Sequence, residues 1–202
     1  MNKEKEMTYT APSWNHIQNL SFELYMMIKK SSFKPDIMAG VSRGGLVPAR
    51  ILSDLYLSDE KKVTLAIMQI GFYSGIDKTK KEPIIYQDLP GHIYGKRILL
   101  IDDVADSGVS LQFALQYLQM KKPLEIVVGT LYHKPWSLLK PQFYVEETSA
   151  WIVFPHERFE FMNDVLKDQN MNAHACKEFF VNKVGINEQA VRNFLKLKEI
   201  KE

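Results

Sequence analysis

The sequence has a single cysteine, Cys176, among its 202 residues. One thiol cannot form an intramolecular disulfide, so a fold held together by disulfide bonds is excluded. A chain of this length buries about 70% of the surface that its unfolded form exposes, and such a core needs no covalent staples. The lone cysteine therefore favours a protein of a reducing compartment.

The chain also lacks a long apolar segment. No run approaches the roughly 18 apolar residues that a membrane-spanning helix requires. The N-terminal segment MNKEKEMTYT is polar and of mixed charge, without the apolar core of a secretory signal or the Arg/Ser bias of a transit peptide. We therefore expect a cytoplasmic protein with no membrane partner.

Neither sign of charge is in excess, because 26 Lys and Arg residues are matched by 24 Asp and Glu residues, for a net charge of +2. A dedicated nucleic-acid binder has a marked basic excess, so nucleic acid is not expected as a partner. The 46% of hydrophobic residues is typical of an ordinary globular domain.

Hydrophobic periodicity predicts strands that alternate with helices, which is typical of a mainly parallel, doubly wound α/β sheet with flanking helices. The predicted helices are 14–30, 46–57 and 111–120, and the predicted strands are 36–41, 63–70, 84–86, 97–101, 125–132, 144–146 and 151–154.

After residue 157 the pattern becomes helical, over 158–167, 173–183 and 188–198. Each segment is apolar on one side, which must be buried on the α/β domain or on a partner subunit. We therefore predict an α/β domain over residues 1–157 and a helical C-terminal extension over residues 158–202. We expect the extension to serve packing and not nucleic-acid binding, because its acidic residues offset the charge of its basic residues.

Two carboxylates, Asp102 and Asp103, follow the apolar run 98–101, which predicts a central strand. They fall at its carboxyl end, the edge at which open α/β sheets bind ligands. Adjacent acids repel each other unless a cation or hydrogen-bond donors offset their charge, which favours a hard metal such as Mg²⁺. A capping Asp beside a solvated one is the alternative.

The next residues form a short polar loop before the predicted helix: Asp106, Ser107, Gly108, Val109 and Ser110. Small residues at a helix N-terminus let backbone N–H groups face a phosphate, whose charge the helix dipole favours. An ordinary N-cap at Ser110 is the alternative. With the two acids, this loop predicts a magnesium-dependent site for a phosphorylated sugar.

A second turn from strand to helix contains Ser42, Arg43, Gly44 and Gly45. It lacks both the lysine of the P-loop and the spacing of the G-x-G-x-x-G motif. The glycines permit close backbone approach, and a guanidinium can grip two oxygens of a diphosphate. A purely structural turn is the alternative.

Together the two loops resemble the pyrophosphate loop and the phosphoribosyl-pyrophosphate (PRPP) motif of the type I phosphoribosyltransferases. The segments HKPW, 133–136, and WIVFP, 151–155, further resemble the 6-oxopurine branch, the xanthine-guanine and hypoxanthine enzymes of bacterial and archaeal type. The resemblance covers residues 36–157. It implies the type I phosphoribosyltransferase fold and a purine salvage reaction in which a 6-oxopurine and PRPP give the nucleoside monophosphate and pyrophosphate.

The resemblance also implies roles on the sugar-phosphate side. Asp102 and Asp103 would hold the ribose hydroxyls and Mg²⁺, and Asp106 would be the general base or proton partner near purine N7. Residues 106–110 would bind the 5-phosphate. Residues 42–45 would bind pyrophosphate, often through a non-proline cis peptide in this family.

On the base side, the resemblance implies that Lys134 reaches purine O6, Trp151 stacks on the ring and the Ile152 backbone reads its edge. A cation beside a carbonyl oxygen rejects 6-amino purines, because two donors would then face each other. Val153 stands where some xanthine-guanine enzymes carry an acid, which favours hypoxanthine and guanine over xanthine. The alternatives are an exposed Lys134 and a Trp151 buried in the core.

The polar stretch 71–95 is placed like the mobile loop of the family, and Lys78, Lys80 and Lys81 could close over pyrophosphate. An ordinary charged loop is the alternative. We expect a homo-oligomer, a dimer or a tetramer. Two other functions stay open: a PRPP-sensing regulatory protein with a helical tail that contacts nucleic acid, and a phosphoribosyltransferase for another base. Asp106 and Lys134 favour the purine enzyme over the sensor, which needs no chemistry on the base side.

Overall fold

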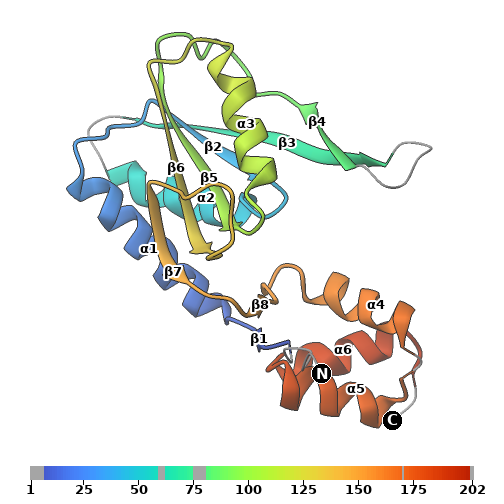
Figure 1. Cartoon of the computed structure of the whole chain (residues 1–202). Helices are drawn as coiled ribbons and strands as arrows, with labels where there is room; N and C mark the ends of the chain where they lie inside the picture. Colours follow the sequence, from blue (N-terminus) through green and yellow to red (C-terminus); the bar gives the residue numbers. More distant parts are fainter. Residues whose placement is uncertain (1–6, 59–61, 75–80, 170, 201–202) are drawn as a thin grey trace. The chain divides into compact units, whose positions relative to one another are not determined.

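The computed structural model describes residues 7–58, 62–74, 81–169 and 171–200 (Figure 1). The chain divides into two compact units. We call Ile17–Thr148 the sheet unit, and Met1–His16 together with Ser149–Glu202 the helical unit. Within the described ranges, no helix has both the length and the apolar character needed to cross a membrane.

The sheet unit is built on one six-stranded sheet, in the order β4-β3-β2-β5-β6-β7. All neighbouring strands are parallel except β3 and β4. The predicted mainly parallel α/β sheet is therefore confirmed. The strands are β2 (Ile37–Ser42), β3 (Thr64–Ser74), β4 (Lys81–Gln87), β5 (Arg97–Ala105), β6 (Glu125–His133) and β7 (Phe143–Glu147).

Helices cover both faces of this sheet (Figure 1). On one face, a Cβ added to Gly129 of β6 would lie 3.5 Å from Leu24 of α1 (Trp14–Lys30). A Cβ on Gly40 of β2 would lie 2.9 Å from Ala49 of α2 (Leu46–Leu55), which a 3₁₀ turn over Tyr56–Ser58 follows. The opposite face packs against Leu111, Ala114 and Leu118 of α3 (Val109–Gln119).

The central strand β5 shows why the apolar run predicted it so well. Its residues Ile98, Leu99, Leu100 and Ile101 alternate between the two covered faces and are all fully buried. The strand is longer than the predicted 97–101, however, because its hydrogen-bonded pairing with β6 continues to Ala105. The two aspartates therefore lie within the strand and not after it.

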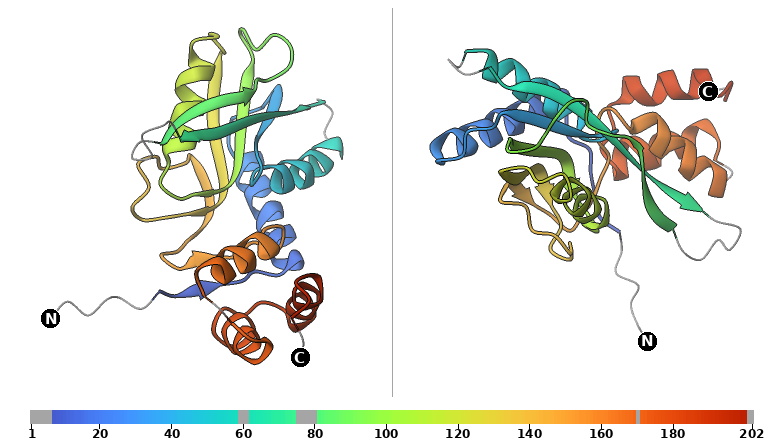
Figure 2. Two further views of the ribbon diagram at one scale, coloured as in Figure 1. Left: turned by 90° about the vertical axis from the view of Figure 1, so that its right-hand side faces the viewer. Right: turned by 90° about the horizontal axis from the view of Figure 1, so that it is seen from above.

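The stretch 71–95 is the largest departure from the predicted elements. Residues as far as Ser74 extend β3, and β4 pairs with them antiparallel, so that the two strands form an arm that Figure 2 shows from two further directions. The predicted strand 84–86 is the middle of β4. Lys78 and Lys80 lie outside the described residues, and Lys81 begins β4.

The helical unit contains a separate two-stranded parallel sheet, in which β1 (Tyr9–Thr10) pairs with β8 (Trp151–Ile152). The predicted strand 151–154 is thus a strand over Trp151–Ile152 only, and it pairs with β1 and not with the six-stranded sheet. Phe180, Phe194 and Met162 lie in the unit's core. Its helices are α4 (Arg158–Asp168), α5 (Ala173–Lys177) and α6 (Glu188–Leu197), with a π-helical turn over Glu178–Lys183 that divides the helix predicted for 173–183.

Candidate functional site

The two loops predicted to bind phosphates meet in the sheet unit. They lie at the carboxyl ends of β2 and β5, which are neighbouring parallel strands, so both are at the same edge of the sheet. A Cβ added to Gly44 would lie 2.5 Å from Oδ1 and 2.6 Å from Oδ2 of Asp103. The backbone of the first loop therefore approaches the carboxylate of the second as closely as only glycine allows.

The glycine loop, which we define as Ser42–Gly45, is shaped by the backbone around it. A Cβ on Gly45 would collide with the carbonyl oxygen of Ile101 and lie 2.7 Å from the backbone of Val41, and the Gly45 N–H donates to the Val41 carbonyl at 2.8 Å. The Ser42–Arg43 peptide is cis, the geometry that the resemblance implies. The side chain of Arg43 is exposed.

The acidic loop, which we define as residues 102–110, places its carboxylates differently. Asp103 is buried, with 5% of its surface exposed. Asp102 is half-buried, and its Oδ1 accepts the Asp103 N–H at 3.0 Å. Asp106 is exposed. A hollow of about 80 Å³ is lined by Asp102, Val104, Asp106, Ser107, Gly108, Ser110 and Leu111.

Gly108 determines where α3 begins. Its φ of 80° lies in the left-handed region, and a Cβ there would lie 2.7 Å from both the Leu139 nitrogen and the Ser137 hydroxyl. The helix starts at Val109, whose N–H donates to the Ser107 hydroxyl at 3.4 Å. Gly108 and not Ser110 is the N-cap, so the alternative of an ordinary cap at Ser110 was wrong.

Lys134 is nearly fully buried, with 3% exposed, so the alternative of a solvent-exposed lysine was wrong. Burial lowers the pKa of its ammonium, while the charge of Asp106 acts in the opposite direction. The backbone N–H of Lys134 donates to the Ala105 carbonyl at 3.0 Å. The backbone N–H of Leu138 donates to the Ser107 carbonyl at the same distance. The HKPW turn is therefore hydrogen-bonded to the acidic loop.

Trp136 is a residue to which the sequence assigned no role, although it lies in the HKPW segment. Its Nε1–H donates to Oδ1 of Asp106 at 3.0 Å, and Lys134 Nζ lies 5.4 Å from the centre of its ring. The motif marked the right turn, but no periodicity or spacing connects Trp136 with an aspartate 30 positions away.

The remaining residues predicted to bind the purine, Trp151 and Ile152, lie in the helical unit. Trp151 is 50% exposed, so the alternative of a core residue was wrong. The N–H of Trp151 donates to the Thr8 carbonyl and the N–H of Val153 to the Thr10 carbonyl, so the amide of Ile152 points to the other edge of β8.

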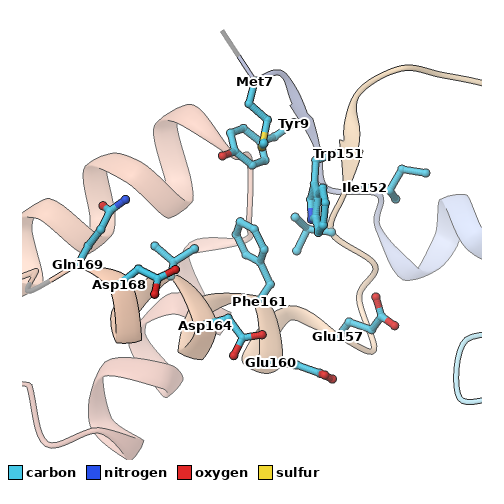
Figure 3. Close-up of a pocket in the computed structure, with 12 residues that line it drawn as sticks. Met7, Tyr9, Trp151, Ile152, Glu157, Glu160, Phe161, Asp164, Asp168 and Gln169 are labelled. Atoms are coloured by element: carbon cyan, nitrogen blue, oxygen red, sulfur yellow. The ribbon is translucent and has the colours of Figure 1, made fainter. Parts of the chain in front are cut away.

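The Trp151 ring lies in a pocket of about 460 Å³ in the helical unit (Figure 3). Tyr9 and Phe161 line it as well, and their rings meet edge to face at 5.9 Å. Four carboxylates contribute to its wall: Glu157, Glu160, Asp164 and Asp168.

The donor set of the acidic loop fits a hard divalent cation. Asp102 and Asp106 offer carboxylate oxygens to one hollow, and Asp103 lies against the glycine loop. Oxygen ligands of this kind are those that Mg²⁺ prefers, usually together with phosphate oxygens of a substrate.

Comparison with known proteins places this geometry in a family. The family model described as "Phosphoribosyl transferase domain" matches residues 9–158, about three quarters of the chain. The chain therefore belongs to the phosphoribosyltransferase domain family, and its fold is the type I phosphoribosyltransferase fold.

Particular relatives narrow the resemblance to the 6-oxopurine branch. The hypoxanthine-guanine phosphoribosyltransferase of Staphylococcus aureus strain Mu50 is 29% identical over 120 residues, which is 59% of this chain and 65% of the relative. The match thus spans less than two thirds of that relative's length. A purine phosphoribosyltransferase structure from Pyrococcus horikoshii has a TM-score of 0.66 and 33% identity, and the match covers 74% of this chain and 94% of that one. A hypoxanthine phosphoribosyltransferase structure from Staphylococcus aureus has a TM-score of 0.54 and 26% identity, with 65% and 72% covered.

Proposed function

We propose that the protein is a purine salvage phosphoribosyltransferase, which converts hypoxanthine or guanine and PRPP to the nucleoside monophosphate and pyrophosphate. The observation that carries this proposal is the close approach of the Gly44 backbone to the Asp103 carboxylate. This contact joins a loop suited to a diphosphate to a loop suited to a sugar phosphate. The named relatives, all purine enzymes, support the same acceptor class.

On the sugar-phosphate side, the proposed roles follow from position and charge. Asp102 and Asp103 bind the ribose hydroxyls and the cation, and residues 106–110 bind the 5-phosphate at the start of α3. The glycine loop, Ser42–Gly45, binds pyrophosphate through its backbone and the Arg43 guanidinium. When bound, Mg²⁺ supplies positive charge to the departing pyrophosphate.

On the base side, Lys134 hydrogen-bonds purine O6, and Asp106 acts as the proton partner of N7. Trp151 stacks on the purine, and the backbone of Ile152 reads its edge. The half-exposed ring of Trp151 and the orientation of the Ile152 amide support these two roles.

The reaction needs positioning and charge more than covalent help. Displacement at the anomeric carbon develops positive charge on the sugar and negative charge on pyrophosphate. Residues that hold the two reactants in line contribute by proximity, and fixed charges stabilise the transition state without reorganising. We assign Arg43 to the leaving group and Asp106 to the base.

Several wider features belong to the same proposal. The α/β domain over 1–157 carries the reaction, which the span of the family model over 9–158 supports, and the helices over 158–202 form an extension. The protein acts as a homo-oligomer, a dimer or a tetramer, in the cytoplasm. The alternative of a PRPP sensor with a nucleic-acid-binding tail is not favoured, because the named relatives are transferases.

The test is a panel of acceptors. The full chain is incubated with PRPP, MgCl₂ and each of hypoxanthine, guanine, xanthine, adenine and uracil, and monophosphate is measured by chromatography. We expect product with hypoxanthine and guanine, and none when EDTA removes the divalent cation. No product with any base would overturn the enzyme proposal, and product with only adenine or uracil would move it to another base.

A further inference from the structure

Trp136 contacts both residues that the proposed function assigns to the base side. Its indole Nε1–H donates to Asp106 Oδ1 at 3.0 Å, and the Lys134 ammonium lies 5.4 Å from the centre of its ring. The indole therefore contacts both the proposed proton partner and the proposed O6 donor.

The burial of Trp136 is unlike that of a core tryptophan. Its side chain is 54% exposed, so most of the apolar surface that would stabilise the fold remains in water. Replacing it with another ring of similar shape should therefore alter the site more than the stability of the chain.

The backbone around Trp136 is fixed on both sides. The N–H of Ser137 donates to the Lys134 carbonyl at 2.9 Å, which closes a turn over Trp136, and the N–H of Leu138 donates to the Ser107 carbonyl at 3.0 Å. Because this turn is bonded to the acidic loop, the indole is presented to Asp106 from a defined backbone position.

A hydrogen bond from the indole restricts rotation of the Asp106 carboxylate. A carboxylate that abstracts or shares a proton must lie within about 3 Å of that proton's heavy atom, so its orientation directly affects the rate. The aromatic face attracts the Lys134 ammonium at the same time.

We infer that Trp136 is a positioning residue for the proposed reaction, orienting Asp106 through its indole N–H and Lys134 through the face of its ring. The inference rests on the proposed function for its kinetic part. The contact between Trp136 and Asp106 can be tested without turnover.

Two substitutions separate the contributions of the ring and the N–H. Trp136→Phe keeps a ring beside Lys134 and removes the donor to Asp106. We expect kcat with hypoxanthine to fall about tenfold, as for loss of one hydrogen bond to a charged group. The KM for PRPP should change less than twofold. Trp136→Leu removes the aromatic face as well, and should raise the KM for hypoxanthine by a further factor of about 2 to 5.

A matched control is available in Trp14, which is 52% exposed and to which the proposed function assigns no role. Trp14→Phe should leave kcat and both KM values unchanged. In an Asp106→Asn background, Trp136→Phe should cost almost nothing further in kcat, because the carboxylate that the indole orients is already absent. Wild-type kcat in Trp136→Phe, or fully additive losses in the double variant, would overturn the inference.

The contact itself is read from the indole ¹⁵N–¹H resonance of Trp136, assigned by its loss in Trp136→Phe. It should move in Asp106→Asn, whereas the Trp14 resonance should not. An unmoved Trp136 resonance overturns the inference whatever the turnover. If the wild-type chain transfers phosphoribose to no base, the proposed function fails, while a moved resonance still supports the contact.

Discussion

The glycine loop and the acidic loop occupy equivalent places in the sheet unit, yet they are built on opposite principles. Each joins a parallel strand to a helix, and each places a glycine immediately before that helix. Gly45 has an ordinary helical φ of −68° and is required by crowding, whereas Gly108 has a φ of 80°. The glycine loop offers backbone and one exposed cation, while the acidic loop offers carboxylates. One structural unit thus supplies two complementary halves of a site.

The largest effect is expected from removing the negative charge of Asp106 in the acidic loop. Asp106→Asn keeps the size of the side chain but removes its capacity to accept a proton. We expect kcat with hypoxanthine to fall by about 100-fold or more, as for loss of a general base. PRPP affinity, measured by calorimetry, should change less than threefold. Equal losses in both quantities would assign Asp106 to binding alone.

Adding a methyl group at each glycine of the glycine loop in turn distinguishes the roles of Gly44 and Gly45. In Gly44→Ala the new Cβ would meet the Asp103 carboxylate, so we expect PRPP affinity to fall about 30-fold, roughly the effect of 2 kcal/mol. In Gly45→Ala it would meet backbone atoms of Ile101 and Val41.

Calorimetry of PRPP binding and thermal unfolding of both variants measure this contrast. Gly45→Ala should lower the unfolding temperature, because backbone atoms cannot move aside as a side chain can. Gly44→Ala should leave that temperature near the wild-type value. Unchanged PRPP affinity in Gly44→Ala would show that its contact with Asp103 does not shape the site.

Lys134 places a buried cation beside the acidic loop, in contrast to the exposed cation of the glycine loop. Lys134→Met should raise the KM for hypoxanthine about tenfold, while thermal unfolding at pH 7 should show no loss of stability, because a buried charge is costly to desolvate. Burial lowers the pKa of Lys134 below the ordinary 10.5, with Asp106 opposing.

The sign of the pH dependence follows from that lowered pKa. At pH values between the native pKa of Lys134 and 10.5, the unfolded chain binds more protons than the native chain. The contribution of Lys134 to stability is therefore present above pH 10.5 and is lost as the pH falls through the native pKa. Unfolding of wild type and Lys134→Met across this window measures it. A wild-type advantage that shrinks as pH rises would contradict the assignment.

The smallest effect belongs to an acid outside both loops. Asp88 accepts hydrogen bonds from Tyr117 and Lys121 at the C-terminal end of α3. Burial acts to raise its pKa, but these bonds, with that from the Leu89 amide, lower it below the ordinary 3.8.

Asp88→Asn should destabilise the protein by only about 0.5 to 1 kcal/mol, because the pair is partly exposed and screened by solvent. That contribution is present above pH 3.8 and is lost as the pH falls through the native pKa, so the difference from wild type in denaturant unfolding should vanish in acid. Turnover should stay at the wild-type level. A large loss of turnover would show that an acid outside the two loops contributes to the reaction.

The sequence predicted the interior of the elements better than their ends. The run 98–101 identified β5 because a strand buried on both faces must be apolar throughout. The sequence did not predict the last residues of β5, because Asp102 and Asp103 are polar. They belong to the strand because its pairing with β6 continues to Ala105. The pairing of β1 with β8 depends on two-residue strands far apart in sequence, for which no periodicity exists.

The sequence proposed the residues of the candidate site but not the contacts among them. Each loop was visible locally, from small residues and charge at the start of a helix. The approach of Gly44 to Asp103 and the bond from Trp136 to Asp106 arise from neighbouring strands, and only tertiary structure supplies them. The burial of Lys134 also depends on tertiary structure, since a lysine after a strand is exposed in most contexts.

The pairing of β1 with β8 has a consequence for synthesis of the chain. The ribosome makes Tyr9 and Thr10 before the whole sheet unit, whereas their partners Trp151 and Ile152 follow it. Domains tend to fold as they emerge. The sheet unit can thus complete its own strands first, while the N-terminal strand must wait for its partner, and a chain released at residue 148 would carry that strand unpaired.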